Sequence, residues 1–117
     1  MKFIETFHGD VCVLGVQGKL KGCQEAEELY QEFKACSTKN VSKIVLDLTK
    51  MDWAGSLGIG ALIGCLTAAR SAGGDLRLSG LNHKILQLLH ITKLDGVFKI
   101  YDTVDLAIDS FKQMSKK

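Results

Sequence analysis

The segment with the most potential for chemistry runs from Asp47 to Gly60 and reads Asp-Leu-Thr-Lys-Met-Asp-Trp-Ala-Gly-Ser-Leu-Gly-Ile-Gly. It joins a predicted buried strand to a predicted helix, and the free N–H groups and dipole of a helix N-terminus favour anions and phosphates. Gly58, Gly60 and Gly64 form a loose G-x-G-x-x-x-G pattern. A P-loop would need a Lys-Ser/Thr pair after these glycines, and the sequence has none there. A dinucleotide site would need an acid at the end of a strand about 20 residues further on, and this is also missing, so we predict no nucleotide site. We expect Gly60 and Gly64 instead to let the helix pack closely on the sheet.

Ser56 is the candidate nucleophile of this segment. Its surroundings, Gly-Ser-Leu-Gly, are not the G-x-S-x-G elbow of hydrolases. A catalytic triad also needs a histidine, and the sequence does not place His8, His83 or His90 beside Ser56. We interpret Ser56 as the N-cap of the following helix and His83 and His90 as surface residues. No acid/base pair can be assembled, so we predict that the chain is not an enzyme and has no catalytic residue.

The four cysteines offer no pattern of metal ligands. Cys12, Cys23, Cys36 and Cys65 have no C-x-x-C spacing, and only three histidines accompany them. We predict no metal site, no cofactor and four buried, reduced thiols, although an even count also permits two disulfides. The first residues, Met1 to Glu5, reach an acid too soon for an export signal, so we expect a cytoplasmic protein.

Composition predicts one ordinary globular domain spanning residues 1–117. Apolar residues make up 46% of the chain and charged residues 24%, and the net charge is only +2. A charge this small and dispersed argues against direct binding of nucleic acid or of an anionic membrane. The uncharged stretch from Trp53 to Ala69 contains four glycines and falls short of the roughly 20 apolar residues of a membrane span. We interpret it as a buried helix.

Hydrophobic periodicity predicts the elements that must position this segment. Strands are expected at 2–7, 11–18, 44–48, 75–79 and 98–101, the first two forming a hairpin, and helices at about 23–36, 57–71, 83–92 and 104–112. A loop is expected between the strand at 44–48 and the helix at 57–71. Asn82 and Thr103 have the chemistry of N-caps for the last two helices. The order ββαβαβαβα predicts an α/β fold with a mixed sheet of four to five strands and about four helices packed on it.

The segment that begins at Asp47 resembles the signature of STAS-domain anti-sigma factor antagonists. These proteins carry D-L-S-x-V-x-F-I-D-S-S-G-L-G after a buried strand, and this chain reads D-L-T-K-M-D-W-A-G-S-L-G-I-G without a gap. Residues 74–82, G-D-L-R-L-S-G-L-N, and residues 94–103, L-D-G-V-F-K-I-Y-D-T, continue the resemblance. It covers essentially the whole chain and implies the same fold as the element order.

The resemblance implies a partner and a regulatory switch. Such antagonists bind an anti-sigma factor that is also a serine kinase, and so regulate sigma-dependent transcription. Phosphorylation of the second serine of D-S-S-G abolishes docking through the added charge, and a PP2C-type phosphatase reverses it. In the ungapped alignment the Asp of this motif is Gly55, the first serine is Ser56, and the phosphorylated serine is Leu57. Because leucine has no hydroxyl, we expect phosphorylation at Ser56 or Thr49, or an unregulated protein.

The same resemblance implies a partner-binding loop. We expect the contact surface to comprise Asp52, Trp53, Gly55, Ser56, Leu57 and Gly58. The alternative function is a non-switching STAS domain that serves as a scaffold, a sensory subunit or a small-ligand-binding subunit.

Overall fold

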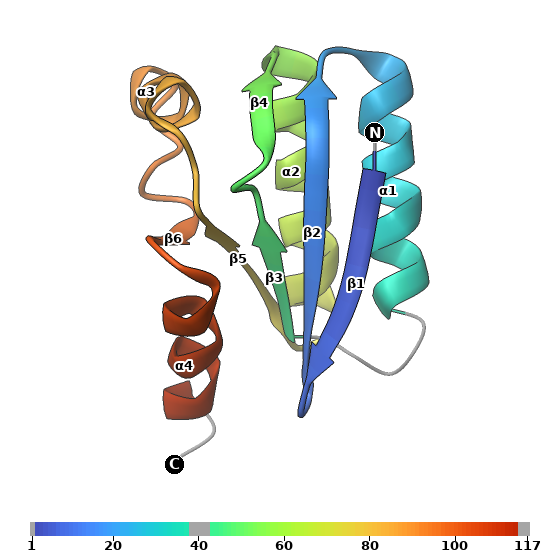
Figure 1. Ribbon diagram of the computed structural model, residues 1–117, viewed down its shortest axis with the longest axis vertical. Helices are drawn as coiled ribbons and strands as arrows, with labels where there is room; N and C mark the ends of the chain where they lie inside the picture. The colour runs from blue at the N-terminus through green and yellow to red at the C-terminus, as the bar shows by residue number, and fades with distance from the viewer. Residues whose placement is uncertain (1, 38–42, 115–117) are drawn as a thin grey trace.

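The computed structural model describes residues 2–37 and 43–114 of the chain. Its elements are β1 (Lys2–His8), β2 (Val11–Leu20), α1 (Cys23–Ser37), β3 (Lys43–Asp47), β4 (Met51–Ala54), α2 (Ser56–Ser71), β5 (Asp75–Ser79), α3 (His83–Ile91), β6 (Lys99–Tyr101) and α4 (Val104–Met114) (Figure 1). The predicted α/β class with a mixed sheet is confirmed. Within these ranges, each helix lacks the length or the apolar character needed to cross a membrane.

The ten-residue strand β2 pairs with three other strands, β1, β3 and β4. It pairs antiparallel with β1, as the predicted hairpin requires, and the sheet continues in the order β1-β2-β3-β5-β6 with parallel pairings. Beyond the end of β3, β2 pairs in parallel with β4. The prediction of a loop between the strand at 44–48 and the helix at 57–71 is therefore wrong for β4. This strand has only four residues, too few for a periodic pattern, and its pairing with the distant residues Gly18 to Leu20 holds it in place.

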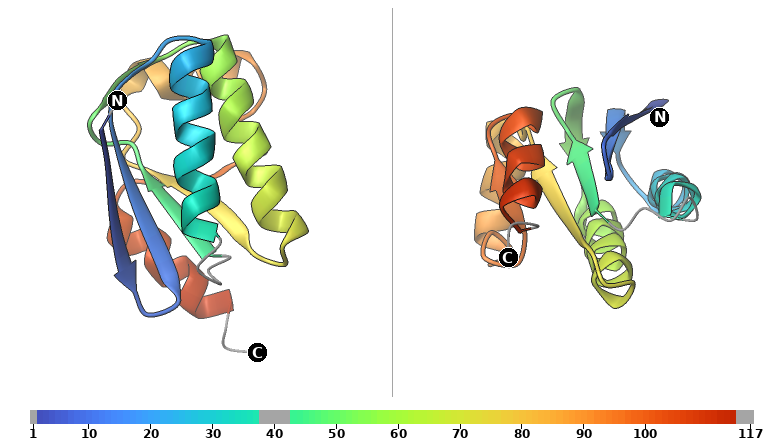
Figure 2. Two further views of the ribbon diagram at one scale, coloured as in Figure 1. Left: turned by 90° about the vertical axis from the view of Figure 1, so that its right-hand side faces the viewer. Right: turned by 90° about the horizontal axis from the view of Figure 1, so that it is seen from below.

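Helices cover both faces of the sheet. Figure 2 shows α1 and α2 side by side on one face and α4 on the other. Both faces of the sheet carry apolar side chains that must be covered, as strand β3 illustrates. Ile44 and Leu46 belong to the core cluster under α1 and α2, whereas Val45 packs in the cluster under α4. A strand that is buried on both faces is a near-continuous apolar run, as this one is.

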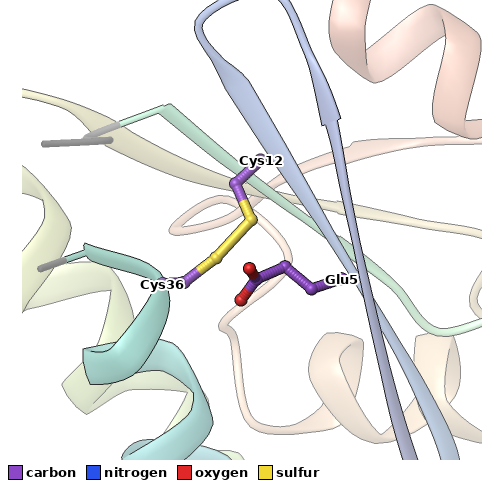
Figure 3. Close-up of side chains that lie close together, drawn as sticks. All are labelled: Glu5, Cys12 and Cys36. Carbon is purple, nitrogen blue, oxygen red and sulfur yellow. A yellow bond between two sulfur atoms is a disulfide. The ribbon is translucent and has the colours of Figure 1, made fainter. Parts of the chain in front are cut away.

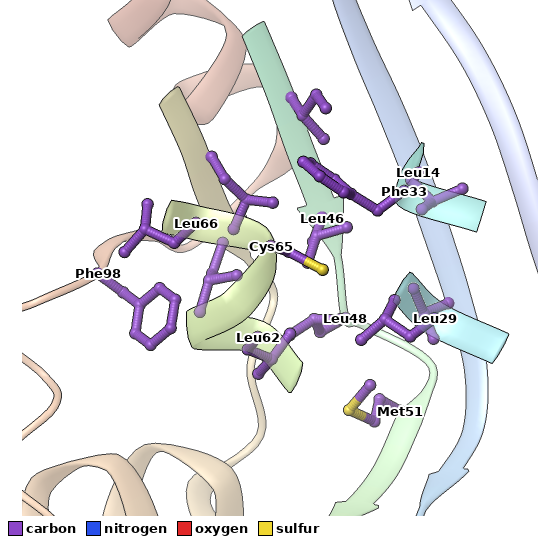
Figure 4. Packing of buried hydrophobic residues seen from close by; sticks show 14 of the residues in the cluster. Leu14, Leu29, Phe33, Leu46, Leu48, Met51, Leu62, Cys65, Leu66 and Phe98 are labelled. Carbon is purple, nitrogen blue, oxygen red and sulfur yellow. The ribbon is translucent and has the colours of Figure 1, made fainter. Parts of the chain in front are cut away.

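The larger core lies between the sheet and helices α1 and α2 (Figure 4). Its largest fully buried members include Phe33 of α1, Leu62 of α2 and Leu14 of β2. Met51 of β4 belongs to the same cluster, so the short strand is anchored by an apolar side chain at its start. Packing of this kind, rather than local propensity, holds so short a strand in place.

Strand β5 is buried at all five positions, although Asp75, Arg77 and Ser79 alternate with its leucines. The Asp75 carboxylate accepts hydrogen bonds from Arg77 Nε at 3.3 Å and Arg70 Nε at 3.1 Å. The Arg77 guanidinium also donates to Ser110 Oγ and lies 4.1 Å from the ring centre of Phe111, both on α4. The polar face of this strand therefore fixes α4 against the sheet, and no buried side-chain polar atom of the described residues lacks a partner.

The glycine that lets α2 pack closely on the sheet is not one of the two that were expected to do so. A Cβ on Gly60 or Gly64 would meet no atom within 4 Å, so the prediction that these two residues allow close packing is wrong. Gly58 has that role, because a Cβ there would lie 2.4 Å from Leu20 Cγ and 3.0 Å from the Leu20 carbonyl oxygen. The first turn of α2 thus approaches the end of β2 at a distance that only glycine permits.

Cys12 of β2 and Cys36 in the last turn of α1 form a disulfide (Figure 3). The prediction of reduced thiols is therefore wrong for this pair, because the packing of α1 on β2 brings together two sulfurs that are 24 positions apart in the sequence. The predicted burial is wrong for Cys23, which is exposed, whereas Cys65 is buried, and burial raises the pKa of the Cys65 thiol to about 12. A Glu5 carboxylate oxygen lies within 4.8 Å of both bonded sulfurs. Sulfurs joined to each other offer no thiolate, so in this state the cluster is not a metal site.

The two kinds of glycine in α2 lead to a stability prediction. We expect Gly58→Ala to lower the free energy of unfolding by about 1–3 kcal/mol, because the new methyl group overlaps buried Leu20. The matched control Gly60→Ala should raise it by about 0.5–1 kcal/mol, since alanine is the better helix former and meets open space. Urea denaturation measures both values. Equal stability of the Gly58→Ala variant and the wild type would contradict the packing described here.

Candidate functional site

The candidate site lies where β2 and β4 end and where α2 and α3 begin (Figure 1). The parallel strands β3, β4 and β5 all run toward this end of the sheet. In open α/β sheets the carboxyl ends of the strands are where binding sites form, because the connections to the helices meet there.

The junction of β4 and α2 is fixed by Gly55. Its N–H donates to the Leu20 carbonyl at 2.9 Å, and its own carbonyl accepts from Ile59 N at 3.0 Å. Gly55 is therefore the N-cap of α2, without a side-chain cap, and the prediction that Ser56 caps this helix is wrong. Ser56 is the first helical residue, and its exposed hydroxyl makes no hydrogen bond with the described part of the chain.

Two large apolar side chains are exposed at this junction. Trp53 of β4 is 46% exposed and Leu57 in the first turn of α2 is 55% exposed. Asp52 is exposed beside Trp53, whereas Gly58 is buried under Leu20. The structure thus places most of the expected partner-binding loop on the surface, with Gly58 as its internal support.

Asn82 ties α3 to β4. Its Oδ1 accepts a hydrogen bond from Ile85 N at 3.0 Å, which confirms the predicted cap. Its Nδ2 donates to the carbonyls of Met51 and Asp52, at 3.2 Å each. These bonds join residues that are about 30 positions apart, so no local sequence pattern predicts them.

Thr49 is exposed but its hydroxyl is engaged. The Asp47 carboxylate accepts hydrogen bonds from the Thr49 N–H, at 3.1 Å, and from its hydroxyl. Gly80, with φ of +71°, packs so closely that a Cβ there would overlap Thr49 Oγ1. Of the two hydroxyls considered for phosphorylation, that of Ser56 is the one without a partner in the described residues.

An open cavity of about 810 Å³ adjoins the junction. It is lined by Lys19, Lys21, Asp52, Trp53, Asn82, His83 and Lys84. Asp52 and Trp53 are predicted site residues, whereas the three lysines were not predicted. These lysines come from β2, the β2–α1 connection and α3, so only the fold brings them together. The lining offers cations and an indole, groups that can bind an anionic or aromatic partner.

The histidines do not form a catalytic dyad with Ser56. His83 is exposed at the cavity, and His90, also exposed, pairs with Asp95 at 2.8 Å, as expected of surface residues. The hydrogen bond with His90 lowers the pKa of Asp95. His8 is exposed in a cavity at the other end of the molecule. Among residues 2–37 and 43–114, none of the three bonds to Ser56.

Comparison with known proteins gives consistent matches. The model of the STAS domain family matches residues 3–107. The anti-sigma-B factor antagonist of Listeria monocytogenes is 30% identical over 101 residues, which span 82% of this chain and 81% of the relative. The solved structure of the Thermotoga maritima protein TM1081 superimposes with a TM-score of 0.84 at 28% identity, covering 92% of each chain.

Two further relatives match over a shorter region. A TM1081 homolog of Thermotoga neapolitana is 34% identical over 71 residues, and a Thermotoga maritima relative is 32% identical over 75 residues. These regions span 61% and 64% of this chain, and 63% and 66% of the relatives' own lengths.

The bonds of Asn82 lead to a prediction about the site's geometry. We expect Asn82→Ala to lower the free energy of unfolding by about 1–2 kcal/mol, because the α3 cap and both bonds to β4 are lost. The emission of Trp53, the only tryptophan, should shift toward that of a solvated indole. Asn82→Asp is the matched control, since it retains the cap acceptor but lacks the amide donors. It should shift the emission with a smaller loss of stability, and unchanged emission in both variants would contradict the role of Asn82.

Proposed function

The chain belongs to the STAS domain family and is an anti-sigma-factor-antagonist-like protein, and from this premise we propose that it binds an anti-sigma factor of the serine-kinase type. Through that binding it regulates sigma-dependent transcription in the cytoplasm, as an interaction protein and not as an enzyme. The observation that carries the proposal is the exposure of Trp53 and Leu57 at the β4–α2 junction. Exposed apolar anchors of this kind, tryptophan above all, are typical of protein interfaces.

We further propose that phosphorylation, where it occurs, has moved to Ser56. Leu57, at the usual phosphoserine position, has no hydroxyl. A phosphate on Ser56 would lie at the start of α2, where free backbone N–H groups stabilise negative charge. A phosphate on Thr49 would instead be repelled by Asp47, the carboxylate that now accepts a hydrogen bond from that hydroxyl. A PP2C-type phosphatase would return Ser56 to its unmodified state.

The alternative is a non-switching STAS domain that serves as a scaffold, a sensory subunit or a small-ligand-binding subunit. The open cavity of about 810 Å³ beside Trp53 supports the ligand-binding form of this alternative. Its cationic lining would suit an anionic aromatic molecule, which could stack on the indole and meet the lysines.

Binding to the serine-kinase anti-sigma factor encoded in the same genome tests the main proposal. We expect Trp53→Ala and Leu57→Ala each to raise the Kd about tenfold in isothermal titration calorimetry, because each removes an apolar anchor. Leu106→Ala is the matched control, since Leu106 is 51% exposed but lies on α4. It should leave the Kd within about twofold. Absence of binding by the wild-type protein, or equal losses in all three variants, would contradict the proposal.

The phosphorylation proposal has its own test. After incubation with that kinase and ATP, we expect mass spectrometry to find one phosphate on Ser56. Ser56→Ala should abolish the modification, whereas Thr49→Val, the control, should leave it unchanged. Phosphate on Thr49, or on neither residue, would contradict the assignment of Ser56.

A further inference from the structure

The cavity beside Trp53 is surrounded by positive charge. We call Lys19, Lys21, His83 and Lys84 the basic rim. Lys19 is the register partner of Trp53 in the β2–β4 pairing, and Lys84 lies in the first turn of α3, which Asn82 holds against β4. The rim is therefore positioned around the indole by strand pairing and by hydrogen bonds.

The rim lysines lack acidic partners within the described part of the chain. The ion pairs described for the other cations join Lys43 to Asp10, Arg70 and Arg77 to Asp75, His90 to Asp95, and Lys112 to Asp109. An adjoining cavity adds Lys2 and Lys50, and it shares Asp52 with the first. Five lysines therefore line two neighbouring cavities at this end of the molecule, and Asp52 is the acid that the two cavities share.

Acidic residues gather at the other end. Asp10, Asp105 and Asp109 line a cavity formed by the β1–β2 turn and α4, together with His8 and Lys112. Figure 1 places α4 and this turn at the bottom and β4 and α3 at the top. Asp10 and Asp109 are paired with Lys43 and Lys112, whereas the rim lysines have no such partner among the described residues, so the rim is the surface that attracts an oppositely charged partner and raises its rate of association.

We propose that the basic rim binds the carboxylates of an acidic protein surface whose apolar centre receives Trp53. This inference rests on the proposed function, because it names the chemistry of the partner at the same site. A protein partner fits better than a nucleic acid, because the rim lines a compact cavity beside an exposed indole and does not form an extended basic stripe.

The rim and the indole have different expected effects on binding. Exposed charge pairs contribute little affinity each, but they accelerate association and make it sensitive to salt. A desolvated tryptophan contributes mainly to the lifetime of the complex. The proposal therefore predicts that charge variants slow association, whereas Trp53→Ala speeds dissociation.

Charge reversal tests this inference with the same anti-sigma factor as probe. The rim variant Lys19→Glu/Lys84→Glu is compared with Lys99→Glu/Lys112→Glu, which changes the net charge equally at exposed positions outside the cavity. Surface plasmon resonance at about 50 and 300 mM NaCl gives both rate constants. We expect the rim variant to lose about tenfold in association rate at low salt and most of its salt dependence, and the control to change less than about threefold. Urea denaturation verifies that both variants are folded.

The outcomes separate this inference from the proposed function. Wild-type binding with equal rates in both charge variants overturns the acidic partner and leaves the proposed function standing. Absence of wild-type binding overturns both. Displacement of the anti-sigma factor by a mixed-sequence DNA duplex at similar concentration also overturns the inference, because it would show that the rim binds the phosphate backbone of DNA.

Discussion

The hydrogen bond from the Gly55 N–H to the Leu20 carbonyl is the contact on which the site depends. It pairs the end of β4 with the end of β2 and makes Gly55 the first residue of the turn into α2. Gly58 then packs directly on Leu20, so helix and strand are held together one turn later. The junction is thus held on β2 from both sides, by the pairing of Trp53 with Lys19 and by the packing of Gly58 on Leu20. Trp53 and Leu57 lie on its exposed side.

Periodicity predicted most of the sheet and the helices because those elements are amphipathic or fully buried, and both patterns are local. The caps at Asn82 and Thr103 were predictable for the same reason, since each acts within its own first turn. The short strand β4, the disulfide partner of Cys12 and the lysines around Trp53 depend instead on contacts between distant segments. The resemblance to the antagonist motif identified Trp53 and Ser56 as site residues. It could not show that Gly55 caps the helix, because that depends on the position of β2.

Leu57 changes the physical character of the site relative to the motif it resembles. A serine in the first turn of a helix presents a hydroxyl that a kinase can convert into a doubly charged group. A leucine in that position, more than half exposed, adds apolar area next to Trp53 and resists such conversion. The adjacent Ser56 retains a hydroxyl at the favourable end of the helix. The junction therefore combines a permanent apolar contact with one position that could still carry a charge.

Residues in the strands and residues in the connections between strands and helices are under different constraints. Three connections, from β2 to α1, from β4 to α2 and from β5 to α3, carry Lys21, Gly55 and Asn82, and all of them lie outside the strand registers. An exposed side chain such as Lys21 can be replaced without disturbing strand pairing or the two-sided core, whereas Gly55 and Asn82 are constrained by their bonds to β2 and β4. The charge that the domain presents to a partner can therefore change while the framework is retained. This chain and a solved structure with which it shares only 28% identity have the same fold, with a TM-score of 0.84, as expected when the framework is constrained more tightly than the exposed connections.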